Sequence, residues 1–103
     1  MEYISTRNSS KIFDFREVFI KGLADDGGLF IPKSLHKVDI NELRGLEYND
    51  LAKKVIYPFI GDFMTENDLD KIIDQSYSVF RKKNVVNLIK VGDRSVLELF
   101  HGP

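Results

Sequence analysis

The sequence predicts a small α+β domain that ends in a pair of antiparallel strands. Two observations support this class. Apolar residues recur at helical spacing in three separate stretches of the 103-residue chain. Around them lie short runs rich in β-branched and aromatic residues, bounded by Gly, Pro and Asp. Strands and helices that do not alternate regularly are typical of an α+β fold. We therefore expect about three helices and several short strands.

The first third of the chain is expected to form a strand, a helix and a turn. Residues 3–6 are rich in β-formers and predict a short strand. A helix should begin at Asp14, because Asp14 and Glu17 have the spacing of a capping box. The Asp-Gly-Gly run at 26–28 predicts a tight turn, since Gly reaches positive φ without steric cost. Residues 29–31 then follow as a short extended segment before a proline.

Two longer helices are predicted in the middle of the chain, after an irregular stretch with one helical turn at residues 40–43. The first covers residues 48–63, and Pro58 should kink or split it, because proline removes a backbone donor and crowds the preceding turn. The second covers residues 65–80 and is capped by Thr65. We expect the apolar stripes of all three helices to share one core. These stripes are Phe15, Val18, Phe19 and Leu23; then Leu51, Ala52, Val55, Ile56, Phe59, Ile60 and Phe63; then Leu69, Ile72, Ile73, Tyr77 and Phe80.

Two strands are expected at the end, over residues 85–91 and 95–100. Gly92 and Asp93 between them fit a hairpin turn. The chain then stops on His101-Gly102-Pro103, directly after an apolar strand, as a cut chain would.

Composition excludes several classes of function. The net charge is -1, from 15 basic and 16 acidic residues, so neither nucleic acid nor an anionic membrane is expected as a partner. The 103 residues contain no Cys, which excludes a disulfide framework and a thiol nucleophile within them. No segment approaches the roughly 20 apolar residues that span a bilayer. We expect a cytoplasmic protein.

Residue patterns alone give few candidates for chemistry. His36 and His101 lack the paired spacing of metal ligands, so no metal site is expected. Gly27-Gly28 is a weak signal of a phosphate-binding loop. The hydroxyl-rich run at residues 5–10 carries Arg7 and could bind an anion, although a polar loop with capping hydroxyls fits its composition better.

Two specific motifs resemble threonine synthases. They are GLADDGGLFIP at residues 22–32 and LELFHGP at residues 97–103. The YISTR run at residues 3–7 and the helix at 51–63 also match, so the resemblance covers essentially the whole chain. Asn8 stands where the family usually has Gly. Asn tolerates the left-handed conformation better than other side chains do, so we expect the turn to be kept.

The resemblance implies the N-terminal region of a type II enzyme that depends on pyridoxal phosphate. Such enzymes convert O-phosphohomoserine and water to L-threonine and phosphate. The lysine that forms the Schiff base would lie a few residues beyond Pro103, and no Lys of this chain stands in its motif. The resemblance therefore implies residues 1–83 as an N-terminal region and 84–103 as a strand pair that leads into the catalytic domain, which would be the partner of this part. Pyridoxal phosphate is expected in the full-length enzyme and not in this part, which should be inactive alone.

Within these residues we expect no catalytic, cofactor-binding or metal-binding residue. Four residues are candidates for proximity to substrate in the full enzyme: His101 and Gly102, which lead toward the lysine, and Ser5 and Arg7, which could reach a phosphate group. Two alternatives stay open. The chain could belong to a threonine-synthase-like phospholyase, or it could be a non-catalytic interaction module that self-associates through apolar surface near residues 97–100.

Overall fold

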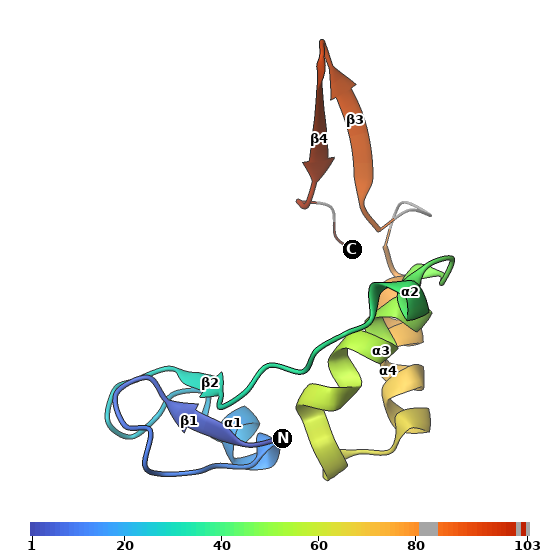
Figure 1. Cartoon of the computed structure of the whole chain (residues 1–103). Coiled ribbons are helices and arrows are strands. Elements are labelled where there is room, and N and C mark those ends of the chain that lie inside the picture. The colour runs from blue at the N-terminus through green and yellow to red at the C-terminus, as the bar shows by residue number, and fades with distance from the viewer. Residues whose placement is uncertain (81–84, 101, 103) are drawn as a thin grey trace.

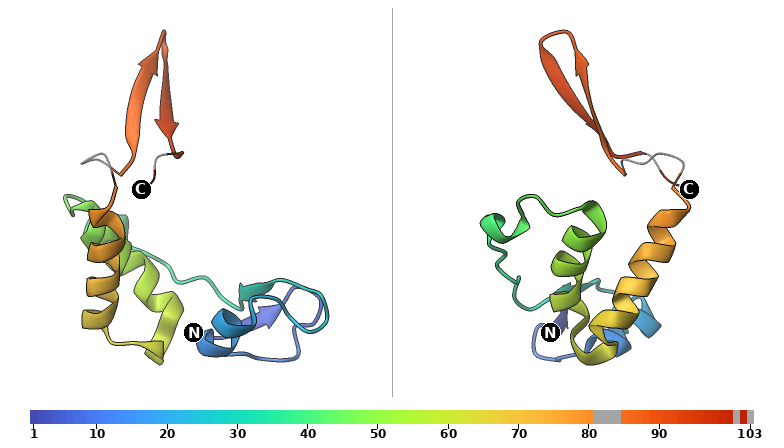
Figure 2. Two further views of the ribbon diagram at one scale, coloured as in Figure 1. Left: turned by 180° about the vertical axis from the view of Figure 1, so that it is seen from behind. Right: turned by 90° about the vertical axis from the view of Figure 1, so that its right-hand side faces the viewer.

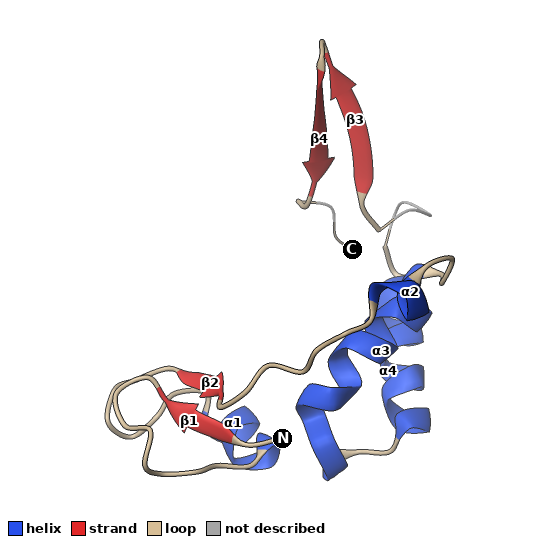
Figure 3. Cartoon of the chain, in the orientation of Figure 1, coloured by secondary structure: helices blue, strands red, loops and turns tan. Residues whose placement is uncertain are grey.

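The computed structural model describes residues 1–80, 85–100 and 102, and within them the fold is α+β, as the sequence predicts (Figure 1, Figure 3). Two antiparallel strand pairs stand at the beginning and the end of the chain, with the longest helices between them. The elements are β1 (Tyr3–Ser5), α1 (Phe15–Lys21), β2 (Phe30–Pro32), α2 (Ile40–Leu43), α3 (Tyr48–Ile60), a 3-10 turn (Gly61–Phe63), α4 (Glu66–Ser78), β3 (Asn87–Val91) and β4 (Arg94–Glu98).

The first strand pair is formed by β1 and β2. The two strands run antiparallel, with Ser5 opposite Phe30. Tyr3 also exchanges both of its backbone hydrogen bonds with Phe13, each at 2.9 Å, so the loop before α1 lies along the other edge of β1. The side chains of Tyr3, Ser5 and Phe13 are buried there, which gives the first 32 residues a small interior of their own.

Helix α1 begins with the predicted capping box. The Asp14 carboxylate accepts a hydrogen bond from the Glu17 backbone N–H at 2.8 Å, and the Glu17 carboxylate accepts one from the Asp14 N–H at 3.1 Å. These bonds satisfy two backbone donors that helix formation alone would leave unpaired. The helix ends at Lys21, where Gly22 leaves the helical conformation with φ +72°.

The turn at Asn8 keeps its shape in a different way from the one predicted. No residue other than Gly has positive φ in the described part of the chain, so Asn8 does not use the left-handed region. Its side-chain oxygen instead accepts hydrogen bonds from the Ser10 N–H at 3.0 Å and the Ser10 hydroxyl at 2.6 Å. Such local bonds hold Asx turns without a glycine.

Helices α3 and α4 lie side by side and hold the main core (Figure 2). Thr65 caps α4 by accepting a hydrogen bond from the Asp68 N–H, as its position predicts. The turn at residues 61–64 reverses the chain so that the apolar faces of the two helices meet. The buried core residues are Ala52, Ile60, Leu69 and Ile73, with Phe15, Tyr57, Met64 and Tyr77 packed around them.

Of the two outcomes predicted for Pro58, a kink or a split of α3, the split does not occur. The helix continues through Pro58 and ends at Ile60. Pro58 has no backbone N–H to donate, and the chain leaves the helix soon afterwards, at Gly61.

The three helical stripes share a smaller core than predicted. Helix α1 has no fully buried residue, and the Phe19 side chain is 66% exposed. Leu23 and Ile72 are also exposed. Phe15 alone among these α1 positions packs against the core of α3 and α4. The expectation of one core for all three stripes is therefore corrected: much of the α1 stripe faces solvent in this part of the protein.

Several contacts join the first strand pair and α1 to the region where α3 ends. The buried Tyr3 hydroxyl donates a hydrogen bond to the Phe59 carbonyl at 2.6 Å. The rings of Phe15 and Phe63 meet edge to face with their centroids 5.3 Å apart. These contacts lie at the end of α3 and in the 3-10 turn that follows it, so this region is the junction between the two parts.

The second strand pair, β3 and β4, is a hairpin that projects away from the helices in every view (Figure 1, Figure 2). Leu88 lies opposite Leu97, and Ile89 lies opposite Val96. Gly92 turns the chain with φ +65°, as the Gly-Asp pair predicts. We call this element the β3–β4 hairpin.

The chain is more open than a compact domain of its size. Its radius of gyration is 16.8 Å, whereas about 13 Å is usual for a compact domain of this length. Its accessible surface is 8017 Å², about a third more than the roughly 5,900 Å² expected for a compact monomer of this mass. Much apolar surface of these residues is therefore uncovered.

Candidate functional site

The candidate site is the contact between the end of β1 and the turn at residues 26–28. Among the described residues Ser5 is the one buried polar residue, with 3% of its surface exposed. Its hydroxyl donates a hydrogen bond to the Asp26 carboxylate at 2.8 Å and accepts one from the Arg7 N–H at 3.1 Å. The Arg7 guanidinium donates to the Asp26 carbonyl at 3.1 Å. Asp26 therefore ties together the two segments. We call this cluster the Asp26 latch: Ser5, Thr6, Arg7, Asp26, Gly27 and Gly28.

The two glycines of the latch allow the segments to approach closely. Gly27 has φ +74°, and a Cβ there would lie 2.9 Å from the Arg7 guanidinium. A Cβ on Gly28 would overlap the Ser5 hydroxyl and would lie 2.9 Å from the Asp26 carboxylate. Steric crowding therefore explains why glycine stands at both positions, and no bound phosphate is needed to explain it.

Hydrogen bonding stabilises the charged form of Asp26. The pKa of Asp26 is lowered from its ordinary value, first by the Ser5 hydroxyl, then by the Gly28 backbone N–H at 2.8 Å, and further by the positive charge of Arg7. A carboxylate that accepts such bonds favours its ionised form. The latch therefore holds a negative charge at its centre, which does not favour an anion at the same place.

We expect the latch to weaken as the pH falls. The folded-state pKa of Asp26 lies below the unfolded value of 3.8, so its contribution is present above pH 3.8 and is lost as the pH falls through the lower folded value. Substituting Ser5→Ala removes the largest cause of the shift and should raise the pKa of Asp26 toward its ordinary value.

An NMR titration of the Asp26 carboxyl carbon measures this pKa directly, and Asp26→Asn assigns the signal. An unchanged Asp26 titration in Ser5→Ala would contradict the role given to the Ser5 hydroxyl.

Of the four substrate-proximal candidates, the structure brings Ser5 and Arg7 together and does not bring Gly102 to them. Ser5 and Arg7 are in the latch, where the only hydroxyl hydrogen of Ser5 is donated to Asp26. Gly102 lies beyond β4, which stands well apart from β1 (Figure 1). His101 lies outside the described residues. Arg7 keeps further N–H groups on an exposed side chain.

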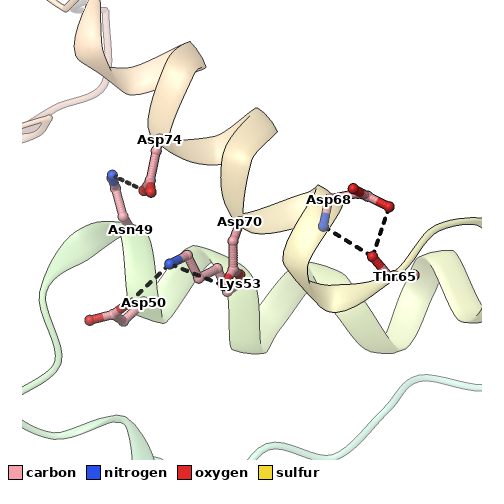
Figure 4. Close-up of polar contacts among 7 residues, drawn as sticks. All are labelled: Asn49, Asp50, Lys53, Thr65, Asp68, Asp70 and Asp74. Atoms are coloured by element: carbon pink, nitrogen blue, oxygen red, sulfur yellow. Dashed lines mark hydrogen bonds and ion pairs between the residues drawn. The ribbon is translucent and has the colours of Figure 1, made fainter.

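Five lysines of the described chain are held in ion pairs with carboxylates. Lys53 lies in an open groove of about 560 Å³ beside α3 and α4, 3.4 Å from Asp50 and 3.6 Å from Asp70 (Figure 4). Desolvation acts to lower the pKa of Lys53, but the hydrogen bond to Asp50 and the charges of Asp70 and Asp74 outweigh it and raise the pKa. The other pairs are Lys21–Asp25, Lys33–Glu2, Lys54–Glu42 and Lys71–Asp68.

These surroundings do not fit pyridoxal phosphate. A Schiff-base lysine needs a neutral amine, and its reactivity rises when its pKa is lowered. The raised pKa of Lys53 acts in the opposite direction, and the carboxylates of Asp50, Glu66 and Asp70 around the groove would repel a phosphate.

The described residues also hold no cluster of three or more His, Cys, Asp or Glu side chains suited to a metal ion. Among the described helices, none has the length and apolar character needed to cross a membrane.

Sequence reasoning missed Asp26 as the centre of the latch. The Asp-Gly-Gly run indicates a turn, but it does not say which distant strand the turn contacts. The signal in the sequence is the complementary pair of segments: a carboxylate followed by two small residues, and a strand that ends at Ser5 and is followed by Thr6. Thr6 completes the contact, since its hydroxyl accepts a hydrogen bond from the Leu29 N–H at 3.0 Å.

Comparison with known proteins gives consistent matches. A family model described as the threonine synthase N terminus matches residues 2–77. The chain is 40% identical to a threonine synthase of Pseudomonas aeruginosa, across 100% of this chain and 23% of that protein. It is 38% identical to threonine synthase-like 2 of Mus musculus, across 99% of this chain and 22% of that protein.

Solved structures match the fold as well. A threonine synthase from Brucella melitensis, described as bound to PLP, matches 100% of this chain and 23% of its own, with a TM-score of 0.90 at 36% identity. A yeast threonine synthase matches 98% of this chain and 22% of its own, with a TM-score of 0.88 at 40% identity. The chain therefore spans less than a quarter of the length of the relatives it matches.

Proposed function

Because the chain belongs to the threonine synthase N-terminal family, we propose that it is the N-terminal part of an enzyme that converts O-phosphohomoserine and water to L-threonine and phosphate. The observation that carries the proposal is the match of the whole chain to threonine synthases in both sequence and fold. The open shape of these residues supports it, since a part that packs against a larger enzyme needs no closed core of its own.

In this proposal, the remainder of the longer chain supplies the chemistry. Pyridoxal phosphate would act there as an electron sink, while the protein orients it. Five lysines of the described residues are held in ion pairs that do not fit the cofactor. We therefore propose that this part is inactive alone and that its partner is the catalytic domain of its own chain. Residues 1–83 form the N-terminal region and 84–103 the strand pair that leads onward; the boundary falls outside the described residues.

The substrate-proximal residues are part of the proposal. Arg7 has free guanidinium donors with which it could reach an anionic group, and Gly102 and His101 would lie on the way to the catalytic lysine. Ser5 would have to give up its hydrogen bond to Asp26 to contact a phosphate, so we assign it the role of holding Arg7 in place.

Two other functions remain as alternatives. A threonine-synthase-like phospholyase is supported by the match to threonine synthase-like 2. An interaction module is supported by the exposed apolar residues near residues 97–100, through which the chain could self-associate. A cytoplasmic location and the absence of a nucleic-acid partner stay predictions.

The proposal is tested by comparing the full-length enzyme with these 103 residues alone. With O-phosphohomoserine, the full-length enzyme should release equal amounts of threonine and phosphate. The 103-residue chain should release neither, and borohydride should trap pyridoxal phosphate on none of its lysines in preference to the others. Phosphate release without threonine would favour the phospholyase, and a specific trapped lysine in the short chain would contradict its proposed inactivity.

A further inference from the structure

The β3–β4 hairpin carries apolar side chains on both of its faces. Residues directly opposite each other in an antiparallel pair share a face, and successive residues alternate between faces. Leu88 and Leu97 therefore lie on one face and are 69% and 52% exposed. Ile89 and Val96 lie on the other face and are 40% and 45% exposed. Neither face has a cover among the described residues, since the hairpin projects away from the helices (Figure 2).

Such two-sided apolar strands are typical of sheets that are buried on both faces. A sheet with one face in solvent alternates apolar and polar residues, whereas strands covered on both sides are nearly continuously apolar. A two-stranded hairpin is at best marginally stable when it stands alone in water. The hairpin is therefore built to lie between two layers.

Polar residues lie at both ends of the hairpin. At its base Asn87 is opposite Glu98, and both are half-buried. Lys90 and Ser95 occupy the pair that follows Leu88 and Leu97 on the same face, and Asp93 and Arg94 stand at the turn itself. All four are exposed. The two apolar pairs, Leu88–Leu97 and Ile89–Val96, therefore lie between a half-buried polar pair at the base and an exposed polar tip.

We propose that the part of the longer enzyme that follows residue 103 covers both faces of this hairpin at the Leu88–Leu97 and Ile89–Val96 pairs and leaves the tip at residues 92–94 in solvent. This inference rests on the proposed function, because it needs the longer chain. That chain supplies enough material for two layers, since these residues are less than a quarter of the relatives' length. A second copy of the chain is a poorer occupant, because one symmetric contact would cover one face and leave the other exposed.

Cysteine labelling of the full-length enzyme tests each face separately. We would compare the maleimide labelling rates of Val96→Cys, Leu97→Cys and, as the tip control, Asp93→Cys, each divided by its rate in urea and read by mass spectrometry of the peptide. Val96→Cys and Leu97→Cys should label at least about tenfold more slowly than Asp93→Cys, because a covered side chain reacts only when the structure opens locally. Comparable rates at position 93 and at either covered position would overturn the proposal.

A second measurement avoids the substitutions. Hydroxyl-radical footprinting of the unsubstituted enzyme should show slower oxidation of Leu88, Ile89, Val96 and Leu97 than in the enzyme unfolded in urea. Protection that disappears on dilution to the monomer would assign the cover to a second copy and would overturn the proposal. An enzyme that makes threonine but labels rapidly at position 96 or 97 would refute this inference alone. Protected positions in a chain without activity toward O-phosphohomoserine would refute the proposed function and leave the covered hairpin standing.

Discussion

Substituting Ile73→Ala should lower the free energy of unfolding by about 2–4 kcal/mol, because a buried Ile is removed from the small core between α3 and α4. Ile73 is only 4% exposed and is one of four buried residues in that core. With so few neighbours to move inward, the cavity left by the missing atoms should persist. This cost is a large fraction of the roughly 5–15 kcal/mol that stabilises a typical domain.

The neighbouring residue is a matched control. Ile72 lies on the same helix but is 47% exposed, so Ile72→Ala should change the free energy of unfolding by less than about 1 kcal/mol. Both variants gain the same helix propensity from Ala, which therefore cancels in the comparison. Urea-induced unfolding followed by circular dichroism measures the difference. Equal losses in the two variants would show that the core is not where the structure places it.

Substituting Gly28→Ala should cost about 3–4 kcal/mol, because the added methyl group overlaps the Ser5 hydroxyl at the centre of the Asp26 latch. Overpacking of this kind costs about 1–3 kcal/mol, and about 1 kcal/mol is added for each hydrogen bond that separates to make room. The Asp26 carboxylate and the Thr6 hydroxyl would also lie only 2.9 Å and 3.0 Å from the new Cβ, so neither side of the turn offers free space. The same unfolding measurement records the loss.

Gly45→Ala separates the effect of crowding from the effect of backbone conformation. Gly45 has φ +78°, and apart from its chain neighbours no atom lies within 4 Å of the place where a methyl group would stand. Its substitution should therefore cost only the left-handed penalty of about 1–2 kcal/mol. In the Gly28→Ala background, Ser5→Ala should recover part of the lost stability, since it removes the overlapping oxygen. A cost at Gly28 no larger than that at Gly45, or no recovery in the double variant, would contradict the steric role of the latch.

Local signals in the sequence were sufficient for most of the fold. The caps at Asp14 and Thr65, the turn at residues 26–28 and the hairpin turn at Gly92 are all confirmed. Each depends on hydrogen bonds or conformations within a few residues, so a single stretch of sequence contains its cause. At Pro58 the sequence left a kink and a split of α3 as alternatives, and the structure excludes the split.

The extent of the core could not be predicted from periodicity. The stripe of α1 is apolar at helical spacing, but Phe19 and Leu23 are exposed, whereas Phe15 packs against the core. Periodicity indicates that a face is apolar; what covers the face depends on segments elsewhere. The contact at the candidate site could not be predicted for the same reason, since Asp26 and Ser5 are 21 positions apart in the sequence. The family motifs identified the region without revealing this contact.

The hairpin with two apolar faces also has a consequence for biosynthesis. If the cover lies downstream, the ribosome releases the hairpin before it has made the segments that will enclose it. Several hundred residues then remain to be translated at about 5–20 residues per second, so the strands wait uncovered for on the order of tens of seconds. During that interval their edges and faces could pair with other nascent chains. We therefore expect the nascent chain to depend on chaperones for longer than a chain in which a segment of this length buries its own apolar surface.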